Sequence, residues 1–306
     1  MIHHLVHTAI DKAHWDTLLL RSNNRMWYAC SAVLDIVAPG WEALIDEGSG
    51  GIMPLPWRSR WGVHYLFQPY GVQQLGVFAP QYDDALGQRF IDAVPARFRY
   101  WDVHVNVAMQ DIRFDRVTHS TQQEIPVLSD MVLQRAAYSQ GHRRNLRKVE
   151  HFRKDLTDHI GPDAFMDLFA RTTAVRFGPT KPKDLMSLRA LIRMLIAHGQ
   201  GRVLGMMEGG ELLAAAVFVE WEGRSIFLKS AVDERAQERS PMFLIIDEYL
   251  SRGAGGSALL DLAGSNTPSV QRFNAGFGAR ASVYLHLIRN RLPPPLRWYK
   301  QRTDGI

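Results

Sequence analysis

The stretch from residue 259 to residue 287, LLDLAGSNTPSVQRFNAGFGARASVYLHL, constrains the fold most strongly because it reads as strand, helix and strand in succession. An apolar run ends at Asp261, and Gly264 and Ser265 supply a turn before a helix that has proline at its first position. Strict alternation from 281 to 287 then predicts a second strand. The pattern indicates an α/β unit with a polar junction at the end of a buried strand.

The same order of elements occurs twice along the chain, which indicates two related domains. Strands are predicted in the first half over 41–45, 51–57, 64–67 and 100–107, with a helix over 83–94. Strands are predicted in the second half over 202–207, 212–221 and 224–232, with a helix over 241–252 that Ser240 caps. Helices are predicted between the halves over 130–138, 140–154, 163–177 and 183–198. We therefore expect domains at 1–127 and 128–306, the second including a helical insertion over 130–200.

The first half also contains a basic, aromatic segment around residue 60. We expect a turn over 58–61 between two strands, because arginine and tryptophan interrupt the apolar pattern there. Trp57 and Trp61 are expected to pack in the core or at a domain interface, since at these spacings such packing is commoner than base stacking.

The segment 259–287 resembles the closing unit of the GNAT acyltransferase fold in its Fem-type variant. The matching residues are Asp261, Gly264, Ser265, Phe273, Phe277, Gly278 and Ala279. The chain departs from the usual pattern at Leu262 and Ala263, where Fem-type proteins commonly have phenylalanine and glutamate, and at Asn274, where they often have lysine. The segments 39–45, 53–57, 73–78 and 291–293 resemble uncharacterised GNAT-like proteins of Bacteroidetes type.

This resemblance implies an α/β protein with two tandem GNAT-like domains, each a mixed twisted sheet flanked by helices. It also implies an N-acyltransferase or aminoacyltransferase that moves an acyl group to an amine. The donor is expected to be an acyl-CoA, an acyl carrier or an aminoacyl-tRNA, with no tightly bound cofactor. The alternative is a GNAT-derived module that has lost turnover and holds tRNA or another anionic partner.

Three residues are candidates for catalysis. Asp261 ends a buried strand, where a carboxylate can accept a proton from an amine, although it can equally cap the turn that follows. Lys229 interrupts an apolar strand, so it faces either a cavity or the strand edge. Tyr284, on the last strand, can protonate a leaving group, but tyrosine at this spacing is more often part of a core.

Donor binding is expected at the loop before the helix that begins near residue 241, because a helix start favours an anion. The candidates in and near this loop are Arg235, Arg239, Ser240, Gly264 and Ser265. Glu238 stands where GNAT proteins often have glycine, and its charge opposes a pyrophosphate. The two arginines are alternatively solvated loop charges.

A cationic cluster in the helix predicted over 140–154 is a candidate phosphate or tRNA site, alternatively a solvated charged face. Its members are Arg143, Arg144, Arg147 and Lys148.

Composition limits the remaining choices. The chain has 306 residues with 46% hydrophobic content, enough for packed cores, and a net charge of +5 with a pI near 9.4. One cysteine, Cys30, allows neither an internal disulfide nor a cysteine metal cluster, and no metal site is expected. No apolar run reaches the roughly 18 residues of a membrane span, so we expect a cytoplasmic protein.

Overall fold

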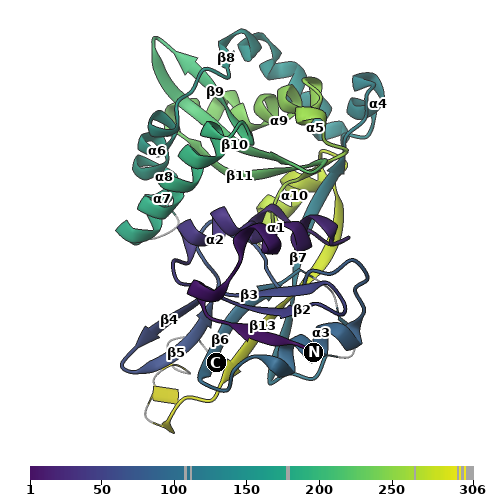
Figure 1. The fold of residues 1–306 in the computed structure, drawn as a ribbon. Helices are drawn as coiled ribbons and strands as arrows, with labels where there is room; N and C mark the ends of the chain where they lie inside the picture. Colours follow the sequence, from purple (N-terminus) through teal and green to yellow (C-terminus); the bar gives the residue numbers. More distant parts are fainter. Residues whose placement is uncertain are drawn as a thin grey trace. The chain divides into compact units, whose positions relative to one another are not determined.

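The computed structural model describes residues 1–106, 109–110, 112–176, 180–264, 267–294, 296–297 and 300. The chain forms two compact units: unit 1 is Met1–Ser120 with Val283–Ile306, and unit 2 is Thr121–Ser282. Each unit contains a sheet flanked by helices, so the predicted α/β class is confirmed (Figure 1). The domain limits at 127 and 128 stay a prediction.

Unit 1 contains two sheets. The smaller is antiparallel, in the order β1 (His3–Leu5), β2 (Glu42–Asp46) and β3 (Gly51–Leu55). The larger sheet has the order β4 (Trp57–Arg60), β5 (Val63–Phe67), β6 (Phe98–Val105) and β13 (Arg280–Asn290), followed by β7 (Arg116–Pro126). The helices of unit 1 are α1 (Lys12–Arg21), α2 (Ser31–Val37) and α3 (Asp84–Ala93).

Helix α3 covers one face of the larger sheet of unit 1. Asp83 caps it, since its carboxylate accepts a hydrogen bond from the Leu86 amide. The apolar side of α3, including Phe90 and Ile91, packs on Trp101 and other residues of β6 and β13. Burial of this face holds the unit together.

The predicted turn over 58–61 is wrong, because β4 is a strand that pairs antiparallel with β5. The single strand predicted over 51–57 is divided into β3 and β4 at Pro56, which has no amide hydrogen to donate to a sheet. The actual turn is at Trp61 and Gly62, both with positive φ. Trp61 is therefore 65% exposed at the tip of the hairpin instead of packing in the core.

In unit 2, helices surround six strands that continue the same ten-stranded sheet. Their order is β7, β12 (Leu259–Asp261), β11 (Arg224–Val232), β10 (Glu211–Trp221), β9 (Gly201–Glu208) and β8 (Leu156–Thr157). The longer helices of unit 2 are α5 (Gln140–Val149), α6 (Pro162–Arg171), α8 (Pro182–Ala197), α9 (Pro241–Ser251) and α10 (Pro268–Ala275). The short helices are α4 (Met131–Ala136) and α7 (Thr173–Arg176).

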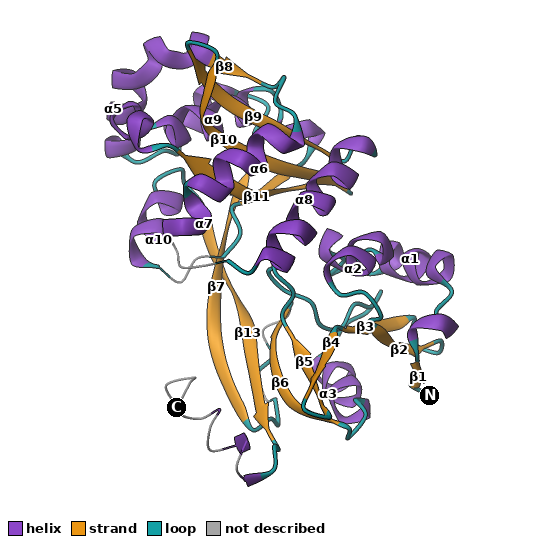
Figure 2. Cartoon of the chain, turned by 90° about the vertical axis from the view of Figure 1, so that its left-hand side faces the viewer, coloured by secondary structure: helices purple, strands orange, loops and turns teal. Residues whose placement is uncertain are grey.

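Helices cover both faces of this sheet (Figure 2). Leu244 and Tyr249 of α9 pack with Ala216 and Phe218 of β10 in one core. Helix α6 packs on the other face of the sheet, where it contacts both β10 and β11. The sheet of unit 2 is therefore the central layer between α9 and α6.

The repeated order predicted from the sequence is confirmed within each unit. In unit 1, β5, α3 and β6 form a strand, helix and parallel strand, and in unit 2, β11, α9 and β12 do the same. An antiparallel hairpin precedes each copy, β4–β5 or β10–β11. Strand β7 was not predicted, and both β7 and β13 cross the division between the units.

Candidate functional site

Strands β11 and β12 of unit 2 separate after a short parallel pairing. They pair only over Arg224–Ile226 and Leu259–Asp261, so residues 227–232 of β11 have no partner on that side among the described strands. On its other side, β11 pairs with β10 along its whole length, with one extra residue, Leu228, inserted as a bulge. The separation leaves a strand edge whose backbone amides and carbonyls can meet a ligand.

Asp261 lies exactly where the two strands separate, and it is fully buried. Its Oδ2 accepts a hydrogen bond of 2.5 Å from Nη2 of Arg224, and its Oδ1 accepts one of 2.8 Å from the Ala263 amide. The same Arg224 nitrogen also contacts Glu124 of β7. Burial raises the pKa of Asp261, while the charge of Arg224 opposes that rise. The carboxylate therefore bonds both to the turn, as the capping alternative predicted, and to the half-buried Arg224.

Lys229 lies on the same sheet face as Asp261. Lys229 lies opposite Val217 of β10, and Val217 and Val219 share a face because they are two residues apart. Val219 lies opposite Ile226, which in turn lies opposite Asp261. Cross-strand partners share a face, so the bulge at Leu228 turns Lys229 back to this side. Only part of Lys229 reaches solvent, and burial lowers the pKa of its amine.

A solvent-open pocket of about 820 Å³ lies at the carboxyl end of β11. Its wall is formed by the end of α6, the start of α7, residues 230–232 of β11 and residues 233–237 of the following loop. The Thr173 hydroxyl donates a 3.1 Å hydrogen bond to the Ser230 carbonyl across this pocket. Arg235 is the predicted site residue that lines it, and Lys229 directly precedes the lining residues. The volume is in the range of small-molecule sites.

The loop between β11 and α9 places its arginines against acids. Arg235 contacts Asp233 through Nε at 3.0 Å and Glu211 through Nη1 at 2.7 Å, and Arg239 contacts Glu208. The hydrogen bond from Arg235 lowers the pKa of Asp233 to about 2. The charge of both arginines is thus balanced locally within unit 2.

Ser240 does not cap α9, contrary to the sequence prediction. Its side chain makes no capping hydrogen bond, because its backbone is left-handed, with φ at 44° and ψ at 51°. Pro241 occupies the first helical position, as predicted. In the first turn of α9 the Phe243 amide instead donates a 3.1 Å hydrogen bond to the backbone carbonyl of Ser240.

The cationic cluster lies on the exposed side of α5. Leu146 and Val149 are buried, whereas Arg143, Arg144, Arg147 and Lys148 are exposed. Arg143 donates a 2.9 Å hydrogen bond to the Ala136 carbonyl at the end of α4. The predicted helix over 140–154 ends at Val149 and continues as a 3-10 turn.

The remaining candidates are Tyr284, Ser265 and Gly264. Tyr284 belongs to unit 1, where it is buried and meets His104 edge-on at 5.6 Å between ring centroids. Ser265 lies outside the described residues. Gly264 follows the Asp261 turn and is partly exposed. Tyr284 and Ser265 therefore stay predictions.

Sequence reasoning missed Arg224 and Glu124. Arg224 begins an apolar strand, so a charge at the edge of a hydrophobic run was the available signal. Glu124 lies on the unpredicted β7, and its carboxylate reaches Arg224 near Ala263, where Fem-type proteins commonly have glutamate. Strand β7 thus supplies a second carboxylate, Glu124, beside Arg224.

Across the described ranges, no helix combines the length and apolarity needed to cross a bilayer. Within the same ranges, no group of three or more histidine, cysteine, aspartate or glutamate side chains is arranged to hold a metal ion.

Residues 135–268 match the family model described as an acetyltransferase (GNAT) domain. No curated protein sequence matches the chain. Among solved structures, FemX is similar with a TM-score of 0.65 and 11% identity, covering 95% of this chain and 98% of its own. A conserved protein of unknown function from Bacteroides thetaiotaomicron has a TM-score of 0.61 and 13% identity, covering 92% and 98%.

A tandem GNAT protein from the clavulanic acid biosynthesis pathway is also similar, with a TM-score of 0.54 and 13% identity over 96% of this chain and 99% of its own. At such identities the likeness concerns the fold. The family match covers the part of unit 2 that contains the separated strands β11 and β12. Residues 135–268 therefore match a GNAT acetyltransferase domain, and the chain as a whole is similar in fold to FemX and to a tandem GNAT protein.

Proposed function

We propose that the protein is an N-acyltransferase or aminoacyltransferase whose donor lies along the free edge of β11. The observation that carries the proposal is the short pairing of β11 with β12, which ends at Ile226 and leaves an unpaired strand edge running to an 820 Å³ pocket. The donor is an acyl-CoA, an acyl carrier or an aminoacyl-tRNA, and the acceptor is an amine. Amides on such an edge can polarise the donor carbonyl and stabilise its negative charge during attack.

Lys229 is the proposed proton acceptor. A lysine acts as a base only when neutral, and burial, which lowers its pKa, increases the neutral fraction. In the reaction the amine nitrogen bonds to the acyl carbon, the carbon–sulfur or carbon–oxygen bond breaks, and the amine proton passes to Lys229. The leaving thiolate or alkoxide then takes up a proton.

Asp261 is proposed as a second catalytic residue, with Arg224 as a positioning residue that holds it. Both oxygens of Asp261 already accept hydrogen bonds, from Arg224 and from Ala263. If Asp261 acts in the transition state, Asp261→Asn lowers kcat more than it weakens donor binding. Equal losses would leave it a structural cap.

A second candidate function is a binding module without turnover. The pairing of Arg235 and Arg239 with acids favours it, because the loop then offers little free positive charge to a pyrophosphate. The exposed cations of α5 would in that case hold tRNA or another anionic partner. In either case we propose the cytoplasm as the compartment.

A thermal-shift panel with acetyl-CoA, longer acyl-CoAs, acyl carrier protein and charged tRNA separates the two functions. A donor that binds the folded state stabilises it by about 2.7 kcal/mol at 100 times its Kd. Transfer is then measured as release of free thiol or free tRNA in the presence of amines. Binding without release in any pairing supports the module.

The pocket can be tested with a matched pair of variants. Val175 lines the pocket and is 70% exposed, so Val175→Trp fills space without disturbing a core. Met186 on α8 is 72% exposed and does not line the pocket, so Met186→Trp is the control. Loss of the donor-induced shift in the first variant alone supports the site, and equal shifts in both contradict it.

A further inference from the structure

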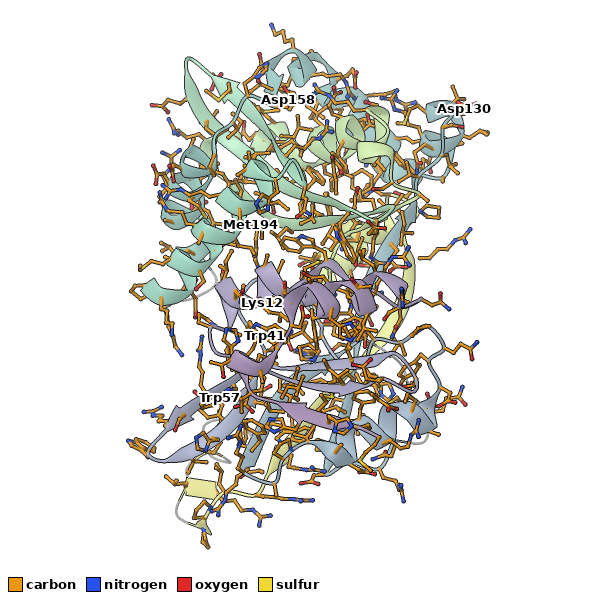
Figure 3. All side chains as sticks on the ribbon, in the orientation of Figure 1. Lys12, Trp41, Trp57, Asp130, Asp158 and Met194 are labelled. Atoms are coloured by element: carbon orange, nitrogen blue, oxygen red, sulfur yellow. The ribbon has the colours of Figure 1, made fainter. Side chains whose placement is uncertain are left out.

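Unit 2 exposes aliphatic side chains on and before α4, next to the cations of α5. Leu128 is 39% exposed, Val132 77% and Leu133 60%. Large aliphatic side chains are usually buried, and three so close together in one short segment leave apolar surface without a protein partner in unit 2. Asp130 caps α4 by accepting a hydrogen bond from the Val132 amide, and Figure 3 shows it at the outer margin of unit 2. We call Leu128, Val132 and Leu133 the α4 knob.

The α4 knob adjoins the cationic side of α5. Ala136 lies one turn after Leu133 on the exposed side of α4, and its carbonyl accepts the hydrogen bond from Arg143. Arg144, Arg147 and Lys148 continue the positive surface along α5. The one acid between residues 128 and 149 is Asp130, and Arg135 in the same range is engaged with the buried Asp247. Four exposed cations therefore face solvent beside exposed aliphatic groups.

We propose that the α4 knob and the cations of α5 form a peripheral binding surface for an anionic lipid bilayer. Aliphatic groups enter the boundary between headgroups and acyl chains, while arginine and lysine bind lipid phosphates. Each part needs the other, because neither three aliphatic side chains nor four cations alone hold a protein firmly on a membrane. RNA would explain the cations but leave the α4 knob unexplained, since RNA is bound through phosphates and aromatic stacking.

This inference does not depend on the transferase activity, because a binding module can use the same surface. It gives the protein a place at the membrane surface without a spanning helix. If the transferase proposal also holds, the acceptor is sought among amines at that surface.

The test is co-sedimentation of the full chain with vesicles of phosphatidylcholine, alone or with 30 mol% phosphatidylglycerol. We expect binding to the anionic vesicles that weakens as salt is raised. In Val132→Ser/Leu133→Ser the apparent affinity should fall at least ten-fold, because two apolar side chains no longer enter the bilayer. In Arg144→Gln/Arg147→Gln/Lys148→Gln it should fall about a hundred-fold, since each cation near the surface contributes roughly five-fold.

Matched controls carry the same changes elsewhere. Leu20→Ser/Met186→Ser removes two exposed aliphatic groups, and Lys181→Gln/Lys183→Gln/Arg280→Gln removes three exposed cations. Both should bind like the wild type, and circular dichroism should show all variants folded. The proposal is overturned if wild type and Val132→Ser/Leu133→Ser bind vesicles equally. It is also overturned if the wild type ignores anionic vesicles and binds tRNA through the α5 cations, which would assign the surface to RNA.

Discussion

Lys229 and Asp261 lie on the same face of the unit 2 sheet although Lys229 and Ile226, the strand partner of Asp261, are an odd number of residues apart. In a regular strand such residues point to opposite faces. The bulge at Leu228 adds one residue, so Lys229 and Ile226 point to the same face. The Lys229 amine and the buried Asp261 carboxylate are thereby presented to the side on which α6 packs. The first two predictions concern this lysine.

Replacing Lys229 should separate catalysis from binding. If the amine accepts the proton, Lys229→Gln lowers kcat by about a hundred-fold or more with little change in KM, as expected for loss of a general base. Steady-state kinetics with a saturating thioester donor measures this. A substitution of Lys183, which is exposed on α8, serves as the control. Full activity in Lys229→Gln would remove the amine from the mechanism.

The pH dependence of kcat in the wild type should follow the fraction of Lys229 that is neutral. Because burial lowers its pKa below the ordinary 10.5, kcat should rise with pH and level off below the usual lysine range. Lys229→Gln should lose this rise. The same shift makes the unfolded chain bind the proton more strongly, so unfolding free energy should fall as pH falls through this window. A flat profile in the wild type contradicts the assignment.

The ion pair between Arg224 and Asp261 should show unequal costs when either side is removed. Arg224→Met leaves Asp261 buried without its cation and should cost about 3–5 kcal/mol of unfolding free energy. Asp261→Asn should cost less, because Glu124 still balances Arg224. Urea unfolding measures both. The double variant Arg224→Met/Asp261→Asn should recover much of the loss, and simple additivity of the two losses would deny the coupling.

Gly276 should be sensitive to a single added methyl group. Its φ of −64° suits any residue, but a Cβ built there overlaps the imidazole of His142. That ring cannot move freely, because it is packed among Phe243, Phe273 and Phe277. Gly276→Ala should therefore lose about 1–3 kcal/mol in urea unfolding.

The matched double variant Gly276→Ala/His142→Ala checks the cause. Removing the ring empties the space that the methyl group needs, so the double variant should be no less stable than His142→Ala alone. If Gly276→Ala costs the same in both backgrounds, the overlap with His142 is not the source.

The sequence predicted the elements whose burial pattern is regular. Strand β11 was predicted at its exact limits, Arg224–Val232, because most of its residues are apolar and turns flank it. Helix α9 was predicted to within one residue, and Glu248 and Arg252 form an ion pair of 2.8 Å at its carboxyl end. Strand β7 was missed because serine, threonine and glutamine fill RVTHSTQQEIP, and tertiary pairing stabilises it where local pattern does not.

Only those site residues that are charged within an apolar run could be predicted from the sequence. Asp261 and Lys229 stood out as charges in apolar runs, and both lie beside the separated strands. Their common face depends on a bulge. Arg224, the arginine that holds Asp261, lies 37 residues earlier, and it also contacts Glu124 on another strand. Such relationships arise from strand register, which a single sequence does not reveal.

The strands β7 and β13 have a consequence for how the protein is made on the ribosome. Every residue of unit 2, Thr121–Ser282, has been synthesised before Val283, whereas unit 1 needs the carboxyl-terminal half of β13 to finish its sheet between β6 and β7. The amino-terminal unit is therefore the last to be completed during translation. Until then the edge of β6 that β13 will cover is open to other chains, which makes β6 the segment of the nascent protein most in need of a chaperone.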